Sequence, residues 1–216
     1  MSLSTITRSI RTPTIDRRGF LVGAIAAGAV AATPASADAA AEAFVSEALA
    51  EVNANADADP KTRAAVVDRL VAEYVDMRRI GRYVLGPYAR VITDAQRATY
   101  RPLFREFARR IYTKLLLQYS GERILVTGSR DRRANDIIVD SRFVDASPGD
   151  PFANVTFNWR VYRDRAGAMS VVDAGADDVF LAIEQQSQFK SVIANNGGGT
   201  RGIDALIEEL RTRLNA

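Results

Sequence analysis

The hydrophobic pattern of this chain changes its period twice, and these two changes limit the possible folds more than any other feature. From Phe44 to Tyr119, apolar residues recur every three to four positions, which is the spacing of one face of an α-helix. Between Ile124 and Asp173 they alternate with polar residues, as in a strand that buries one face. From Asp178 onward the helical spacing returns. The chain is therefore expected to form helices, then strands, then helices again.

Local signals place the helices more closely. Four are expected before the strands, beginning near residues 44, 60, 77 and 93. Thr93 and Gln96 fit the capping box, in which each side chain satisfies a free backbone N–H of the first helical turn. Pro102 lies inside the fourth helical pattern and removes one backbone hydrogen bond. We expect a bend there, or a short helix that abuts a longer one.

The central strands are expected to pair with their sequence neighbours. About four strands follow one another without crossover helices, so they must pair antiparallel. The charged segment 130–133 is interpreted as the first turn, and Arg165–Gly167 as a later hairpin turn. Helices and strands are segregated along the chain, which is typical of α+β proteins. The expected fold is a curved antiparallel sheet packed against a set of helices.

The first 37 residues have the features of an export signal. Arg17 and Arg18 precede Gly19-Phe20-Leu21, an uncharged segment follows, and Ala35-Ser36-Ala37 closes it. A basic head, a short apolar middle and an A-x-A end predict a cleaved signal peptide. The arginine pair resembles the twin-arginine variant, with the general secretory route as the alternative. We expect residues 1–37 to be removed and residues 38–216 to form a single soluble domain in the periplasm.

Composition excludes several classes of function. The chain has a net charge of +3, but residues 1–37 hold four Arg and one Asp, so residues 38–216 carry no net charge. Such a domain has no electrostatic footprint for nucleic acid. The absence of Cys and His removes thiolate chemistry, the Ser-His-Asp arrangement and the commonest metal ligands. We expect no catalytic residue, cofactor or metal.

Two remaining motifs have plain structural interpretations. Asp177 and Asp178, with Asp173 nearby, could be read as a metal cluster, but they fall where the last strand gives way to a helix. Asp178 is therefore expected to cap that helix. The triple glycine 197–199 lacks the Lys-Ser/Thr of a phosphate-binding loop, and we interpret it as a helix breaker.

Several short motifs together resemble a known family, the periplasmic lipid carriers of the toluene-tolerance, or MlaC, type. The similarity spans roughly residues 66–210. The motifs that carry it are Arg79-Ile80-Gly81-Arg82-Tyr83-Val84-Leu85-Gly86-Pro87-Tyr88, Thr93-Asp94-Ala95-Gln96-Arg97, Phe104-Arg105-Glu106-Phe107, Tyr112, Leu116-Leu117-Gln118-Tyr119-Ser120-Gly121-Glu122, Val171-Val172-Asp173 and Gln185-Gln186-Ser187-Gln188-Phe189. No single motif is diagnostic, but their order and spacing are fairly specific.

This resemblance implies a lipid carrier with an apolar cavity between the sheet and the helices. The sheet positions would face the apolar stripe of the longest helix across that cavity. The residues expected to line it are Val84, Leu103, Phe104, Phe107, Ile111, Tyr112, Leu115, Val139, Phe143, Val155, Phe157 and Trp159. The ligand would be a phospholipid. The implied partners are an inner-membrane ABC transporter with a lipid-binding ring subunit and an outer-membrane lipoprotein complex, in a pathway that maintains outer-membrane lipid asymmetry.

The residues alone leave alternatives open. Without the resemblance, the same apolar positions describe an ordinary core. An α+β fold of this kind could also host a small-molecule lyase or isomerase, with Asp140 or Asp173 beside Tyr162 or Tyr112 as acid and base. A carrier of a hopanoid or another apolar ligand is a further alternative, and so is an adaptor protein without any cavity.

Overall fold

A computed structural model of the chain describes residues 38–116, 123–144 and 153–215. They belong to one compact unit, Ala35–Ala216. The predicted signal peptide and the part of the family motifs at residues 117–122 lie outside the described residues. Within the described ranges, no helix is both long and apolar enough to span a membrane.

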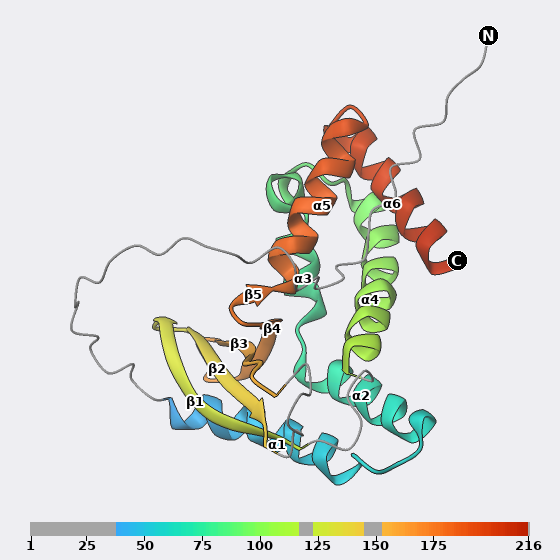
Figure 1. Cartoon of the computed structure of the whole chain (residues 1–216). Coiled ribbons are helices and arrows are strands. Elements are labelled where there is room, and N and C mark those ends of the chain that lie inside the picture. Colours follow the sequence, from blue (N-terminus) through green and yellow to red (C-terminus); the bar gives the residue numbers. More distant parts are fainter. Residues whose placement is uncertain (1–37, 117–122, 145–152, 216) are drawn as a thin grey trace, which may run out of the picture. The chain divides into compact units, whose positions relative to one another are not determined.

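The order of elements follows the two changes of hydrophobic period (Figure 1). The helices are α1 (Ala39–Ala54), α2 (Pro60–Tyr74), α3 (Met77–Val84), the 3-10 helix η2 (Gly86–Arg90), α4 (Asp94–Leu116), α5 (Leu181–Asn195) and α6 (Gly199–Asn215). The strands are β1 (Ile124–Arg133), β2 (Asp136–Phe143), β3 (Phe157–Arg163), β4 (Met169–Ala176) and the two-residue β5 (Val179–Phe180). The predicted α+β class is confirmed.

The helix starts are fixed by short polar side chains. The carboxylates of Asp38, Asp59 and Asp76 accept hydrogen bonds from first-turn backbone N–H groups of α1, α2 and α3. The predicted capping box is confirmed, because Thr93 N donates to Gln96 Oε1 and Gln96 N donates to Thr93 Oγ1, both at 3.2 Å. Pro102 does not divide α4, which continues through it.

The sheet is an antiparallel meander in the order β1-β2-β3-β4-β5. The segment 130–133, interpreted above as a turn, is instead the end of β1, with Arg130 opposite Ile138 and Asp131 opposite Ile137. The interpretation failed because it relied on charge alone. Cross-strand carboxylates on β2 pair with two of these arginines, so the charged strand end remains in the sheet.

The register gives the sheet two different faces. One face carries apolar side chains from every long strand and holds the buried residues Ile137, Val139, Phe157 and Val161. The other face carries the charged or polar residues of the same strands, which include Asp136, Asp140, Asn158 and Arg160. This matches the alternation in the sequence, because successive side chains in a strand point to opposite faces.

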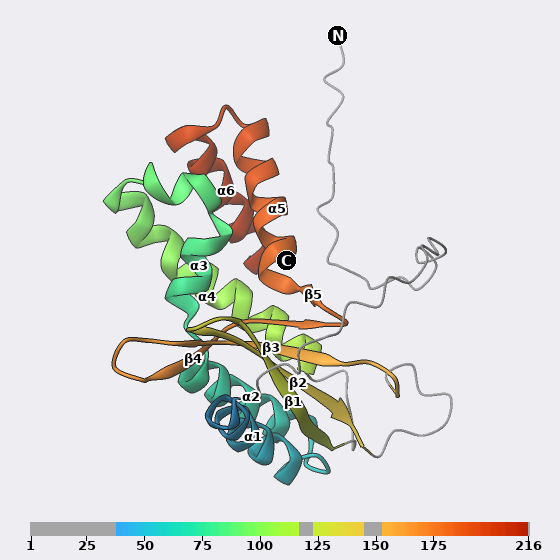
Figure 2. The ribbon, with the colours of Figure 1, turned by 90° about the vertical axis from the view of Figure 1, so that its left-hand side faces the viewer.

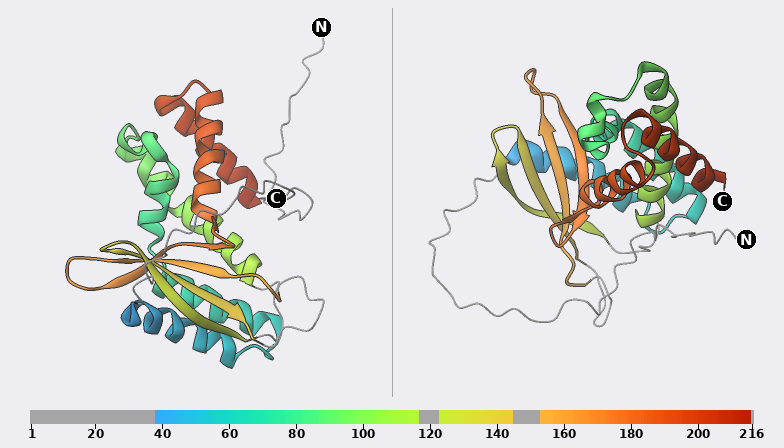
Figure 3. Two further views of the ribbon diagram at one scale, coloured as in Figure 1. Left: turned by 60° about the vertical axis from the view of Figure 1, so that its left-hand side comes forward. Right: turned by 90° about the horizontal axis from the view of Figure 1, so that it is seen from above.

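Helices lie on both sides of the sheet. Figure 2 shows α1 and α2 on one side and α3, α5 and α6 on the other, and Figure 3 shows the same arrangement from two further directions. Helix α1 lies along β1 and covers the apolar face. It is fastened near its end, where Asn53 Nδ2 donates to Ile124 O and Ile124 N donates to Asn53 Oδ1, both at 2.9 Å.

The link from β4 to β5 is a tight turn through Asp177 and Asp178, whose φ angles are 48° and 64°. Two successive residues with positive φ are typical of a type I′ hairpin turn, and Asp tolerates this conformation. Thr156 N donates to Asp177 Oδ1 at 3.0 Å, and Asp178 N donates to Asn158 Oδ1 at 2.7 Å. The turn is thus bonded to β3 and the residues that lead into it.

Candidate functional site

Buried apolar side chains gather in two separate clusters. The helical cluster is formed by α3 to α6 and centres on Phe104, Phe107 and Phe189. The ring centroid of Phe189 lies 6.2 Å from that of Phe104 and 6.0 Å from that of Phe107. Of the predicted lining residues it contains Val84, Phe104 and Phe107, with Leu103, Ile111 and Tyr112 partly buried against it. Leu115 belongs to α4, but its side chain is not among those that the structure describes.

The second cluster joins the apolar sheet face to α1. It contains Val139, Phe143 and Phe157, together with Ala41, Val45 and Leu49 of α1. Val155 and Trp159 pack against it, and the Trp159 Nε1 donates to the buried Ser141 Oγ at 2.8 Å. The sequence predicts that these sheet residues face the stripe of the long helix across a cavity, whereas the described helical side chains packed against them come from α1.

Helix α2 connects the two clusters. It contacts α1, α4 and β4 and buries Val67, Leu70 and Val71. Its Asp68 accepts hydrogen bonds from Arg109 Nη1 at 2.6 Å and from Thr113 Oγ1 at 2.7 Å, both on α4. We call the junction of the two clusters, bounded by α2, β4 and the C-terminal half of α4, the seam.

At the seam, Tyr112 of α4 lies near Asp173 of β4. Burial raises the pKa of the Tyr112 phenol, and the nearby carboxylate of Asp173 raises that pKa further. Tyr112 and its neighbour Ile111 are partly buried. Of the predicted lining residues of α4, Tyr112 is the one with a described interaction that reaches a strand residue.

Asp173 is the most unusual polar residue of the interior. Its side chain is fully buried, and its Oδ1 accepts hydrogen bonds from Ala182 N and Ala174 N, both at 2.9 Å. It therefore caps α5 from a neighbouring strand, whereas Phe180 at the N-cap position offers no side-chain bond. Asp178, which the sequence predicted as the cap, pairs with Arg130 instead. The prediction failed because the capping group comes from a strand that folding brings beneath the helix.

The environment of Asp173 disfavours its ionised form. Burial raises the pKa of Asp173 to about 6, although the two backbone hydrogen bonds and the charges of Arg160 and Arg132 act in the opposite direction. Among the described side chains, its Oδ2 and the Nε2 of Gln185 are buried atoms without a hydrogen-bond partner. The sequence pattern placed Asp173 at the end of the alternating segment and considered it beside Tyr112, but it did not indicate the capping bonds.

The polar face of the sheet is occupied by ion pairs. Asp140 accepts from Arg130 and, at 2.7 Å, from Asn158 Nδ2. Asp136 binds both Arg160 Nε and Arg160 Nη2, at 2.7 and 2.8 Å. Among the described residues, no group of three or more acidic side chains could hold a metal ion.

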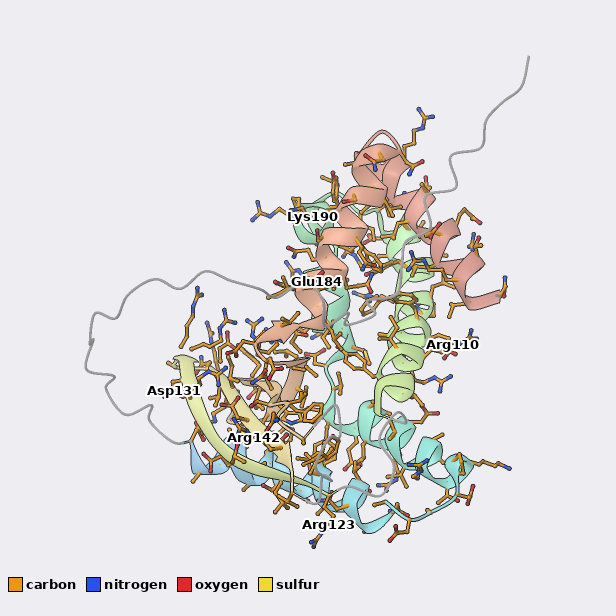
Figure 4. All side chains as sticks on the ribbon, viewed as in Figure 1. Arg110, Arg123, Asp131, Arg142, Glu184 and Lys190 are labelled. Carbon is orange, nitrogen blue, oxygen red and sulfur yellow. The ribbon has the colours of Figure 1, made fainter. Side chains whose placement is uncertain are left out.

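Of the enzyme candidates, Tyr162 does not join Asp140 or Asp173 as an acid–base pair. Its ring is covered by the guanidinium of Arg79, 3.7 Å from the ring centroid. Tyr112 lies near Asp173, but the capping bonds of Asp173 give this carboxylate a structural role. The exposed side chains of Arg110, Glu184 and Lys190 point outward from their helices in Figure 4.

Comparison with known proteins decides the family. The model of the MlaC protein family matches residues 41–212, which is most of the chain. The chain belongs to the MlaC family. This confirms the resemblance drawn from the short motifs. MlaC proteins are lipid carriers rather than enzymes, so the acid–base alternative is set aside.

A solved structure supports the fold independently. This chain is similar to a phospholipid-binding protein from Ralstonia solanacearum, which was determined in complex with a phospholipid. The two share 23% sequence identity and superpose with a TM-score of 0.64 over 80% of this chain and 96% of that chain. At this identity the similarity establishes the common fold.

Proposed function

We propose that this MlaC protein carries a phospholipid through the periplasm, between an inner-membrane ABC transporter with a lipid-binding ring subunit and an outer-membrane lipoprotein complex. The family match over residues 41–212 is the observation that carries the proposal. The phospholipid bound by the structurally similar Ralstonia protein supports the choice of ligand. The carrier would thereby help to maintain the lipid asymmetry of the outer membrane.

We propose the seam as the place where the acyl chains lie. The helical cluster and the sheet cluster, between which the predicted lining residues are divided, would supply its apolar walls. A ligand that enters along α2 and β4 would contact partly buried residues of both clusters, such as Ile111 and Trp159. Fully buried residues such as Val139 would pack beneath the residues that contact the lipid.

Transport of this kind requires no catalytic group. Moving an acyl chain from water into an apolar site is favourable by roughly 0.8 kcal/mol for each buried CH₂. A dry site for two long chains is therefore sufficient to hold a lipid in an aqueous compartment. Release requires a second conformation with lower affinity, which the membrane partners would select.

The decisive experiment examines protein that was exported from the full chain and recovered from the periplasm without detergent. Native mass spectrometry should show the mass of the protein plus a phospholipid, and solvent extraction should identify that lipid. If the protein arrives without lipid and takes none from phospholipid vesicles, the carrier function is wrong. A hopanoid in the extract would keep the carrier but change its ligand.

A further inference from the structure

The backbone nitrogen of Asp38 lies in a polar site made by two other parts of the chain. Asp38 N donates a hydrogen bond to Ser129 Oγ on β1 at 2.7 Å. The hydroxyl of Ser129 in turn donates to Glu42 Oε1 on α1, also at 2.7 Å. A single hydroxyl therefore connects the nitrogen of Asp38 to a carboxylate.

The side chain of Asp38 is held as firmly as its backbone. Its carboxylate accepts two hydrogen bonds from Arg163 Nη2 on β3, at 2.7 and 2.8 Å, and one from Ala41 N at 3.0 Å. The Arg163 hydrogen bond is the main reason that the pKa of Asp38 lies below its ordinary value. The residue at the start of α1 is thus bonded to both β1 and β3.

This site has more acceptor capacity than an amide can use. A peptide N–H offers one proton, which goes to Ser129 Oγ, and the carboxylate of Glu42 lies one hydrogen bond beyond that oxygen. A primary ammonium group offers three donors and a positive charge. The A-x-A sequence that ends at Ala37 predicts that cleavage converts this nitrogen from an amide to an amine.

We propose that Ser129 and Glu42 form a binding site for the α-ammonium group that cleavage after residue 37 creates at Asp38. A signal peptidase hydrolyses the peptide bond between residues 37 and 38. Water supplies the hydroxyl that completes the carboxyl group of Ala37 and a proton for the nitrogen of Asp38, which then takes a further proton from solvent. The new ammonium keeps its bond to Ser129 and gains an ionic interaction with Glu42.

The local charges favour this arrangement. The N-terminus of α1 carries a partial positive charge that opposes an ammonium, as does the guanidinium of Arg163. Arg163 is already neutralised by Asp38, and the carboxylate of Glu42 offsets the partial charge of the helix end. Cleavage would therefore tighten the attachment of α1 to β1, and the mature domain would differ from its precursor at the start of this helix.

The test compares periplasmic proteins exported from the full chain. One has the natural cleavage region, and a second has Gly-Ser inserted between Ala37 and Asp38, so that cleavage leaves Asp38 as an amide. Each is also made with Glu42→Gln, and each N-terminus is read by mass spectrometry. We expect the α-amino pKa at Asp38, measured by NMR titration, to lie about one unit above the ordinary value of about 7.7–8.0.

We further expect the natural protein to melt at a higher temperature than the protein with the Gly-Ser insertion. Glu42→Gln should abolish both the pKa shift and this difference in melting temperature. A Ser129→Ala variant keeps the charge of Glu42 and should therefore retain part of the pKa shift. It provides a second test in case Glu42→Gln is too unstable to be compared by melting. An ordinary α-amino pKa in the natural protein would overturn the proposal. A mature N-terminus at any residue other than Asp38 would overturn it as well. Lipid binding is measured in the same samples, and its loss would count against the carrier function alone.

Discussion

Asp173 shows how one residue can link a sheet to a helix at an energetic cost. Its carboxylate caps α5 from β4, yet the ionised form is disfavoured by burial, which raises its pKa to about 6 from an ordinary value of 3.8. Because the folded protein binds this proton more tightly than the unfolded chain, stability falls as pH rises between these two values. The penalty amounts to about 3 kcal/mol at neutral pH.

This predicts a specific effect of Asp173→Asn. The amide cannot ionise, so the variant should lose the decrease in stability between about pH 4 and pH 6 that the natural protein shows. Urea unfolding at several pH values measures this. Glu106→Gln is the control, because the hydrogen bond from Arg109 lowers the pKa of Glu106 to about 2 from 4.5. The ionised Glu106 therefore stabilises the protein at higher pH, and this stabilisation is lost only as the pH falls below about 4.5. If Asp173→Asn leaves the slope unchanged, the capping carboxylate is ionised at little cost.

At the scale of elements, local sequence predicted what local interactions determine. The capping box at Thr93 and Gln96 needed only a spacing of three residues, and the structure confirms it. The pairing of Arg130 at the end of β1 and the cap that Asp173 supplies join residues ten and nine positions apart, which only the folded strands and the β4–β5 turn bring together. The sequence therefore predicted the two-faced sheet but not which helix covers it, because periodicity identifies a buried face and not its neighbour.

Replacing Thr93 with Ala should destabilise the protein by about 1 kcal/mol, because the first turn of α4 loses the acceptor for Gln96 N. Chemical denaturation measures the difference. Thr99→Ala is the matched control, since this half-buried Thr lies within α4 and its hydroxyl bonds to Ala95 O of the preceding turn. Equal effects of the two substitutions would argue against the cap.

Gly175 is the position where the β4–β5 hairpin should tolerate no side chain. A Cβ at this residue would lie 2.2 Å from Val179 O, which is backbone and cannot rotate away. Gly175→Ala should therefore separate β5 from β4 and lower the melting temperature. Gly167→Ser is the comparison, since the space around that exposed turn is open and only its positive φ opposes the change. A smaller loss for Gly175→Ala than for Gly167→Ser would contradict this.

At the scale of the whole molecule, the seam should respond differently from the core. Ile111→Trp adds volume at a partly buried position, so we expect lipid binding to fall while the melting temperature of lipid-free protein changes little. Ile203→Trp adds the same volume at a position with no exposure in the same cluster, and overpacking there should cost about 1–3 kcal/mol. Vesicle-uptake assays and thermal melting separate the two effects. A large loss of stability in Ile111→Trp would make that position ordinary core.

Export is a second property of the whole chain. Replacing Arg17 and Arg18 together by Lys should leave precursor in the cytoplasm, because the twin-arginine receptor reads the pair itself rather than its charge. Cell fractionation with an antibody against the protein measures this. Normal processing of the Lys-Lys variant would assign the chain to the general secretory route.

The position of β1 at the border of the described sheet has a consequence for behaviour in a crowded compartment. An open strand edge is a template on which a second molecule can add its own strand, and this leads to aggregation. In β1 the pairing register shifts between Val126 and Gly128 and again between Asp131 and Arg133, and the strand ends in charged residues. Irregular spacing and charge make this border a poor template. The same strand that holds α1 in place thus also helps to keep copies of the protein apart.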